Sequence, residues 1–152
     1  ETHRTLDTRL AICELIASHT DMILVGDTFI NASTQKVMKE FQEGFVSLKA
    51  QAPAALTGKV LHDRIDASDF VYRVLGTRGS ALLGGEVSTT IRTVGEINQA
   101  NAGYGRYQGE IEIAKVELPA DVRQNVIGHL LPSEIAVFTA LPEGFGIQLE
   151  VE

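Results

Sequence analysis

The sequence predicts an α+β protein, in which a short helix-strand-helix segment at residues 1–44 precedes a small β-barrel or sandwich at residues 45–152. Two observations lead to this prediction. Before Gly44, apolar residues recur at helical spacing around one short, continuous apolar run. From Phe45 onward the period changes to two, and short apolar runs are separated by turns. We therefore place a domain boundary near Gly44.

The first segment combines two amphipathic helices with one strand. The helices are expected at residues 6–18, with a cap at Thr5, and at residues 33–43, with a cap at Asn31 or Ser33 and a stop at Gly44. Between them, residues 22–25 form a continuous apolar run, which is typical of a strand buried on both faces of a parallel sheet. One strand cannot close a sheet alone, so its neighbours are expected elsewhere.

The second segment is predicted to be mainly β-structure. Strands are expected at residues 45–50, 86–91, 106–118, 126–131 and 145–151. The apolar phase of the strand at 106–118 shifts partway along, which indicates a bulge near Ala114. A short helix is expected at residues 68–75, a loop at 95–105 and a helical turn at 132–141.

Composition and charge exclude several classes of protein. Hydrophobic residues make up 44% of the 152 residues and charged residues 22%, which is the balance of a soluble globular protein. The net charge of −7 disfavours binding to nucleic acids and to anionic membranes. No apolar run approaches the roughly 20 residues that span a bilayer. Cys13 has no partner for an internal disulfide, and no signal peptide is present, so a cytoplasmic setting is expected.

Metal and cofactor sites are not expected. The four histidines and the one cysteine lack the spacing of metal ligands, and the chain has no phosphate-loop or dinucleotide motif. Asp27 is the candidate catalytic residue, because it follows the apolar run 22–25 and would stand at the carboxyl end of a parallel strand. The alternative is that Asp27 only turns the chain. Glycoside hydrolysis usually needs two carboxyl groups, and this chain offers one at a strand end.

Arginines and tyrosines form the candidate binding residues. Five arginines occur in a stretch with a single lysine: Arg64, Arg73, Arg78, Arg92 and Arg106. Because the guanidinium group binds carboxylate and phosphate bidentately, this choice indicates an anionic ligand, whereas the alternative is ordinary ion pairing with Asp63, Asp66, Asp69, Glu86 and Glu96. Tyr104 and Tyr107 flank glycines, so they either stack on a sugar or simply pack on a strand.

Residues 103–113, followed by Leu118–Asp121 and Asn125–Gly128, closely resemble the 6-phospho-N-acetylmuramidase family. Upstream, His3-Arg4, residues 23–27, Arg64, Arg73, Arg78, and Arg92 with Gly95 also fall where that family places similar residues. Two positions depart from the family pattern. The chain has Leu61-His62-Asp63-Arg64 where a histidine often precedes an Asn-Arg pair, and Ala100-Asn101 where Asp-Asn is frequent.

The resemblance implies a (β/α)8 TIM barrel, with residues 1–44 as its last helix-strand-helix piece, joined to a cyclophilin-like β-barrel domain at residues 45–152. It implies hydrolysis of the β-linkage of 6-phospho-N-acetylmuramic acid in cell-wall recycling, with this chain as an inactive fragment of the enzyme. Asp27 would be catalytic. Arg73, Arg78, Arg92 and Arg106 would hold the phosphate or lactyl carboxylate of a phosphorylated amino-sugar, and Asn101, Tyr104 and Tyr107 would line the sugar site. The alternative is a non-catalytic module that stabilises the barrel or forms a homodimer.

Overall fold

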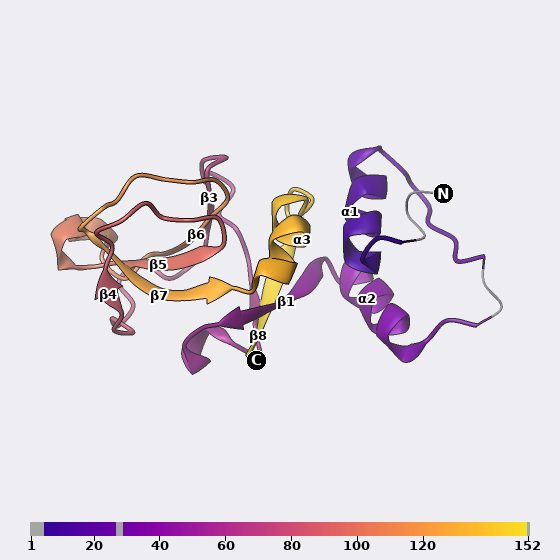
Figure 1. The fold of residues 1–152 in the computed structure, drawn as a ribbon, viewed down its shortest axis with the longest axis horizontal. Coiled ribbons are helices and arrows are strands. Elements are labelled where there is room, and N and C mark those ends of the chain that lie inside the picture. The colour runs from indigo at the N-terminus through magenta and orange to yellow at the C-terminus, as the bar shows by residue number, and fades with distance from the viewer. Residues whose placement is uncertain (1–4, 27–28, 152) are drawn as a thin grey trace.

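The computed structural model describes residues 5–26 and 29–151. Figure 1 shows an elongated molecule, with helices α1 (Thr8–Ala17) and α2 (Ala32–Gln42) at one end and most of the strands at the other. A third helix, α3 (Ile135–Thr139), packs beside α1 between the first two helices and the sheet. The described part of the chain is therefore a mixed α+β fold.

Both predicted N-terminal helices are confirmed, and a side chain caps each. The carboxylate of Asp7, not Thr5, caps α1 by accepting a hydrogen bond of 2.8 Å from the backbone N–H of Arg9. Asn31 caps α2 by accepting a bond of 2.8 Å from the N–H three residues along. Gly44 has a φ of +79°, a left-handed conformation in which glycine ends a helix without steric cost.

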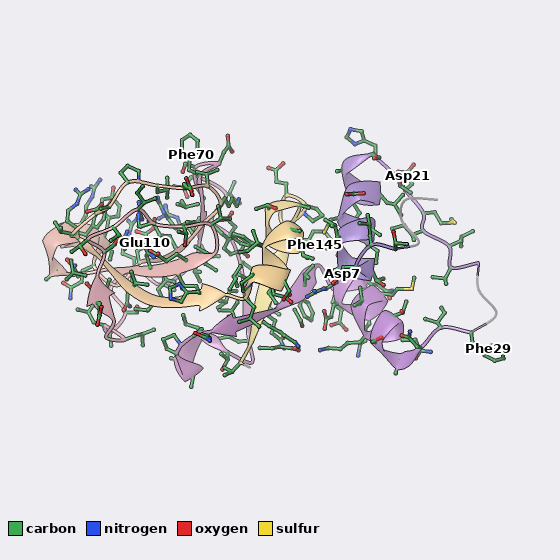
Figure 2. All side chains as sticks on the ribbon, in the orientation of Figure 1. Asp7, Asp21, Phe29, Phe70, Glu110 and Phe145 are labelled. Atoms are coloured by element: carbon green, nitrogen blue, oxygen red, sulfur yellow. The ribbon has the colours of Figure 1, made fainter. Side chains whose placement is uncertain are left out.

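The predicted buried strand at residues 22–25 is wrong. Met22 and Leu24 are 72% and 81% exposed, and this segment forms no ladder with any described residue. The side chain of Phe29 also points away from the helices (Figure 2). A strand buried on both faces needs neighbours for its backbone and its side chains. Every strand in the described part of the chain lies at residue 45 or later, so these neighbours are missing here.

The strands form one curled sheet. They are β1 (Phe45–Gln51), β2 (Val60–Leu61), β3 (Val71–Arg73), β4 (Glu86–Val87), β5 (Glu96–Ala100), β6 (Ile111–Ala114), β7 (Gln124–Leu130) and β8 (Gly146–Val151). Their order is β2-β8-β1-β7-β5-β6-β3, and β4 pairs with β7. β1 and β8 run parallel, whereas the other pairs are antiparallel. An isolated bridge between Asp63 and Val74 joins the two edges, which gives the sheet a barrel-like shape.

The alternation predicted from Phe45 is confirmed by the core. Val46 and Leu48 of β1 are fully buried, and they lie opposite Ile147 and Leu149 of β8. The predicted strand at 126–131 corresponds to β7, and the predicted helical turn at 132–141 corresponds to η4 (Pro132–Glu134) followed by α3. These segments carry their apolar periodicity in their own sequence, so local patterns were sufficient to identify them.

Two predicted segments have a different structure. Residues 68–75 contain β3 instead of a helix, and Tyr72 is buried because it pairs across from Ile113 of β6. Residues 95–105, expected as a loop, contain β5, which lies in the sheet between β6 and β7. All five residues of β5 are buried. Its glycines and asparagines suggested a loop, but the side chain of Gln99 donates a hydrogen bond of 3.0 Å to the carbonyl oxygen of Ala81 and accepts one of 2.8 Å from the N–H of Leu83.

The predicted long strand at 106–118 is also wrong. Residues 102–107 form the 3₁₀ helix η3 (Ala102–Tyr107), and β6 spans only four residues. Gly105 and Gly109 have φ values of +57° and +85°, which cannot continue a strand. The register shift lies between Ile97 and Asn98 of β5, not near Ala114. Of the strand expected at 86–91, only the first two residues pair, as β4.

Buried polar contacts fasten the helices to the sheet. From α1, Arg9 donates a hydrogen bond of 2.9 Å to the carbonyl oxygen of Ser47 and forms an ion pair with Glu134. From α2, the carboxylate of Glu40 accepts bonds from the N–H and the hydroxyl of Ser47 at 3.1 and 2.9 Å. Both helices therefore contact β1 directly, and the domain boundary near Gly44 stays a prediction.

Candidate functional site

A pocket of about 250 Å³ lies where β3, β5, β6, β7 and η3 meet. Six of its lining residues come from these five elements, and Glu110 lies directly before β6: Arg73, Ala100, Tyr104, Tyr107, Glu110, Glu112 and Gln124. Strand register brings them together. Arg73 lies opposite Glu112, and Ala100 lies opposite Gln124. Residues that face each other across antiparallel strands point to the same side of the sheet, so these side chains share one face.

The short helix η3 places both tyrosines at the pocket. Asn101 caps this helix, since its Oδ1 accepts a hydrogen bond of 2.9 Å from the N–H of Gly103. Its Nδ2 donates to the carbonyl oxygen of Val122, also at 2.9 Å. The rings of Tyr104 and Tyr107 meet edge to face, with centroids 6.0 Å apart. Asn101 thus holds the aromatic wall in place and does not itself line the pocket.

Guanidinium groups flank both tyrosine rings. Arg78 and Arg106 lie 4.5 and 4.8 Å from the centroid of Tyr107, and Arg123 lies 4.4 Å from that of Tyr104. Such stacking holds a guanidinium group near the ring while its N–H groups stay available. In the described part of the chain Arg106 forms no ion pair, and its Nη2 donates a bond of 2.7 Å to the Tyr107 hydroxyl.

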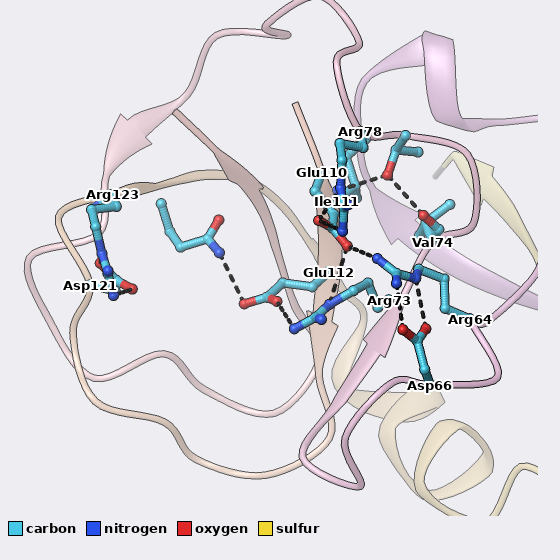
Figure 3. A network of polar contacts seen from close by, with 12 residues as sticks. Arg64, Asp66, Arg73, Val74, Arg78, Glu110, Ile111, Glu112, Asp121 and Arg123 are labelled. Carbon is cyan, nitrogen blue, oxygen red and sulfur yellow. Dashed lines mark hydrogen bonds and ion pairs between the residues drawn. The ribbon is translucent and has the colours of Figure 1, made fainter. Parts of the chain in front are cut away.

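Two carboxylates and four arginines form a network, and Figure 3 shows Glu110 and Glu112 with three of these arginines. Glu110 is paired with Arg64 at 2.7 Å, Arg78 at 3.2 Å and Arg73 at 3.5 Å. Glu112 is paired with Arg92 at 2.6 Å and, more loosely, with Arg73 at 3.6 Å. Both carboxylates are buried. Four of the five predicted arginines therefore converge on Glu110 and Glu112.

The arginines do form ion pairs, as the alternative expected, but mostly with Glu110 and Glu112 and not with the acidic residues named for it. Of the acidic residues named for it, only Asp66 pairs with one of these arginines, Arg64, at 2.6 Å. Asp63 pairs with Lys115 instead. Glu110, Glu112 and Gln124 were not predicted as site residues. Glu110, directly before β6, and Glu112 within it alternate with the buried Ile111 and Ile113, and this alternation was the signal for a second, polar face.

Two further groups at the pocket have shifted pKa values. Burial raises the pKa of Tyr104 above its ordinary value of 10.0, so the hydroxyl remains a hydrogen-bond donor at neutral pH. Hydrogen bonds from the Arg123 guanidinium hold the pKa of Asp121 below its ordinary value of 3.8. The Tyr104 hydroxyl is therefore neutral.

Asp27 lies outside the described residues. Over residues 5–26 and 29–151, no group of three or more histidine, cysteine, aspartate or glutamate side chains is placed to hold a metal ion. The same residues contain no helix that is long and apolar enough to cross a membrane.

The sequence over residues 29–150 matches the family model described as 6-phospho-N-acetylmuramidase, C-terminal. The chain belongs to this family. The match covers most of the chain, including every residue that lines the pocket. The comparison with curated proteins gave no match.

Two solved structures resemble this member of the 6-phospho-N-acetylmuramidase family. A conserved protein from Enterococcus faecalis with an unknown function has a TM-score of 0.71 and 27% identity over 95% of this chain and 41% of its own. An uncharacterized B. cereus protein has a TM-score of 0.68 and 19% identity over 99% of this chain and 46% of its own. The present chain thus spans less than half the length of either protein.

Proposed function

We propose that this chain is the C-terminal part of an intracellular phosphosugar glycoside hydrolase that cleaves 6-phospho-N-acetylmuramyl glycosides in cell-wall recycling. The family match supports a glycosidase parent and a phosphorylated amino-sugar substrate. The observation that carries the proposal is the pocket lined by Tyr104 and Tyr107, because guanidinium groups stack on both of these rings. Sugars bind to aromatic faces, and arginines hold phosphate groups.

In this proposal the arginines have different roles. Arg78 and Arg106, stacked on Tyr107, hold the phosphate or lactyl carboxylate at the rim. Arg73 lines the pocket and contacts the sugar. Arg92 is buried against Glu112 and acts on the substrate only by positioning that carboxylate.

The remainder of the proposal concerns the parent enzyme. Residues 45–152 form a cyclophilin-like β-barrel domain, and residues 1–44, which contain α1 and α2, belong to the end of a (β/α)8 barrel. The exposed apolar side chains of Met22 and Leu24 support this assignment, because a neighbouring barrel strand would cover them. Asp27 stands at the rim of that barrel as a catalytic carboxylate, and its partner belongs to the rest of the barrel.

Isothermal titration calorimetry tests the binding step on this chain. We expect N-acetylmuramic acid 6-phosphate to bind more tightly than unphosphorylated N-acetylmuramic acid. Arg106→Ala should weaken binding by about tenfold to a hundredfold, because a charged hydrogen bond is lost. Lys59→Ala, an exposed cation remote from the pocket, is the matched control and should bind as the wild type does. Equal affinity for the two sugars would contradict the proposal.

A second test uses the full-length parent enzyme. Arg106→Ala and Asp27→Asn should each lower kcat/KM for a 6-phospho-muramyl disaccharide. An unchanged kcat/KM in Arg106→Ala would remove that residue from the substrate site. An unchanged kcat in Asp27→Asn would remove the catalytic assignment and leave Asp27 as a turn residue.

One observation favours a second function, a non-catalytic module that stabilises the barrel or forms a homodimer. Arg64, Arg73, Arg78 and Arg92 already have carboxylate partners, as expected of a network that only stabilises a fold. Calorimetry combined with light scattering separates the two functions. No heat with any 6-phosphosugar, together with a dimeric mass, would favour the module.

A further inference from the structure

Gln124 is a buried side chain with an unused hydrogen-bond acceptor. It is 2% exposed and lines the pocket, and its Nε2 donates a bond of 3.1 Å to Oε1 of Glu112. A carboxylate only accepts, so this bond sets the orientation of the amide and leaves Oε1 on the other side. Within the described chain, Oε1 has no hydrogen-bond partner. Buried acceptors are rarely left unpaired, so this atom needs a donor from outside the described residues.

Arg73 supplies an unused donor beside the same carboxylate. Its Nε is buried and makes no hydrogen bond within the described residues, although it forms a loose ion pair with Oε1 of Glu110 at 3.5 Å. Its Nη2 lies 3.6 Å from Oε2 of Glu112, whereas Gln124 contacts Oε1 of that group. Arg73 and Gln124 therefore both contact Glu112, Arg73 through Nη2 and Gln124 through Nε2, and each side chain has one further polar atom without a hydrogen bond.

The charges at the base of the pocket select against an anion there. Glu110 and Glu112 both line the pocket, with Arg73 as the one guanidinium among the lining residues, and Arg73 is shared between them. A phosphate at this point would face two carboxylates and the carbonyl oxygen of Gln124. A cationic ligand would gain little electrostatic attraction at this point, because arginines already neutralise both carboxylates. A purely apolar group would leave the donor and acceptor unpaired.

A neutral secondary amide satisfies all of these constraints. Its trans peptide-like plane presents N–H on one edge and C=O on the other, so it pairs with an acceptor and a donor at once. Its methyl group finds an apolar surface on Tyr104 and Tyr107. We propose that the base of the pocket binds an acylamino group, whose N–H donates to Gln124 Oε1 and whose carbonyl accepts from Arg73 Nε. The identity of this group rests on the proposed function: it is the acetamido group of the sugar, and the phosphate lies at the rim.

Gln124 is then a specificity-determining residue. A site built to pair with an N–H rejects an analogue that lacks it, because the buried acceptor stays unpaired. The closest analogue is the ester, in which an oxygen replaces the N–H and the carbonyl is kept. N-acetylglucosamine and 2-O-acetylglucose differ in only this respect, and neither carries a phosphate.

NMR titration of the ¹⁵N-labelled chain with these two sugars tests the inference. We expect N-acetylglucosamine to bind at least about tenfold more tightly than 2-O-acetylglucose, and to shift the side-chain amide of Gln124 and the backbone amides of Ala100 and Glu112. Gln124→Met should bind the two sugars equally, whereas Gln35→Met, an exposed glutamine remote from the pocket, should keep the preference. The comparison of sugars on the wild type decides the question even where Gln124→Met fails to fold.

The outcomes separate this inference from the proposed function. Equal affinity for the two sugars, or no shift at Gln124 with about 50 mM N-acetylglucosamine, overturns the acylamino site. If the chain binds the amide more tightly than the ester but a 6-phosphate does not raise the affinity, the acylamino site stands and the proposed function is contradicted. If a 6-phosphate raises the affinity but the amide and the ester bind equally, the proposed function stands and the acylamino site is contradicted.

Discussion

Arg92 and Glu112 form a buried ion pair, in which Nη1 of Arg92 donates a hydrogen bond of 2.6 Å to the Glu112 carboxylate. Arg92 also donates from Nε to the carbonyl oxygen of Pro119 at 3.2 Å. Both side chains are about nine-tenths buried. The pair fixes Glu112 at the base of the pocket, where Gln124 and Arg73 also contact it.

Removing one member of this pair should destabilise the fold. Arg92→Met leaves the Glu112 carboxylate buried without its closest cation, and we expect the free energy of unfolding to fall by about 3 kcal/mol. Urea denaturation followed by circular dichroism measures it. The double variant Arg92→Met with Glu112→Met should recover part of the loss, because no charge is left unpaired. A single variant as stable as the wild type would show that the pair is not structural.

Arg9 should anchor α1 to the sheet much more strongly than a surface ion pair does. Arg9→Ala leaves Glu134, which is 3% exposed, without its cation and the Ser47 carbonyl without a donor. We expect a loss of about 3 kcal/mol in the free energy of unfolding. Lys39→Ala is the control, because Lys39 is 75% exposed and its 3.8 Å pair with Glu43 lies at the surface. It should cost about 0–1 kcal/mol. Equal losses in the two variants would contradict the anchoring role.

Cys13 should be unreactive in the native protein. Its side chain is fully buried in α1, and burial raises the pKa of the thiol to about 11. Because the thiolate is the reactive form, almost none is present at pH 8. Ellman's reagent should label the native chain slowly and the chain unfolded in guanidinium chloride rapidly. Fast labelling of the native chain at pH 8 would mean that α1 opens readily.

Asp121 should make stability depend on pH in the acid range. Hydrogen bonds from Arg123 lower the pKa of Asp121 in the folded state below its ordinary value of 3.8. Such a group contributes stability that is complete above the unfolded pKa and is lost as pH falls through the folded pKa. Between pH 6 and about pH 3 the wild type should therefore lose more in Tm than Asp121→Asn does. Thermal unfolding at several pH values measures it, and parallel curves for the two proteins would exclude a role for Asp121.

Segments whose structure depends on local contacts were predictable from the sequence. The helix at residues 33–43 has its cap at Asn31 and its stop at Gly44, and both signals lie within a few residues of the helix. The strands β1 and β8 carry apolar residues at alternate positions, from Val46 to Ala50 and from Ile147 to Val151. The motif around Tyr104 to Glu110 was enough to place the chain in its family, which the match over residues 29–150 confirms.

Tertiary structure alone decided which polar residues meet. Glu112 and Gln124 lie on different strands, and only the antiparallel register around β5 brings them within hydrogen-bond distance of each other. The same register buries the polar strand β5, which sequence composition had marked as a loop. Periodicity reports whether a side chain is apolar, but it cannot report that a buried carboxylate finds an arginine from a distant segment. The sequence by itself determined the family, both N-terminal helices and the apolar core, whereas the pairing of distant strands created the pocket.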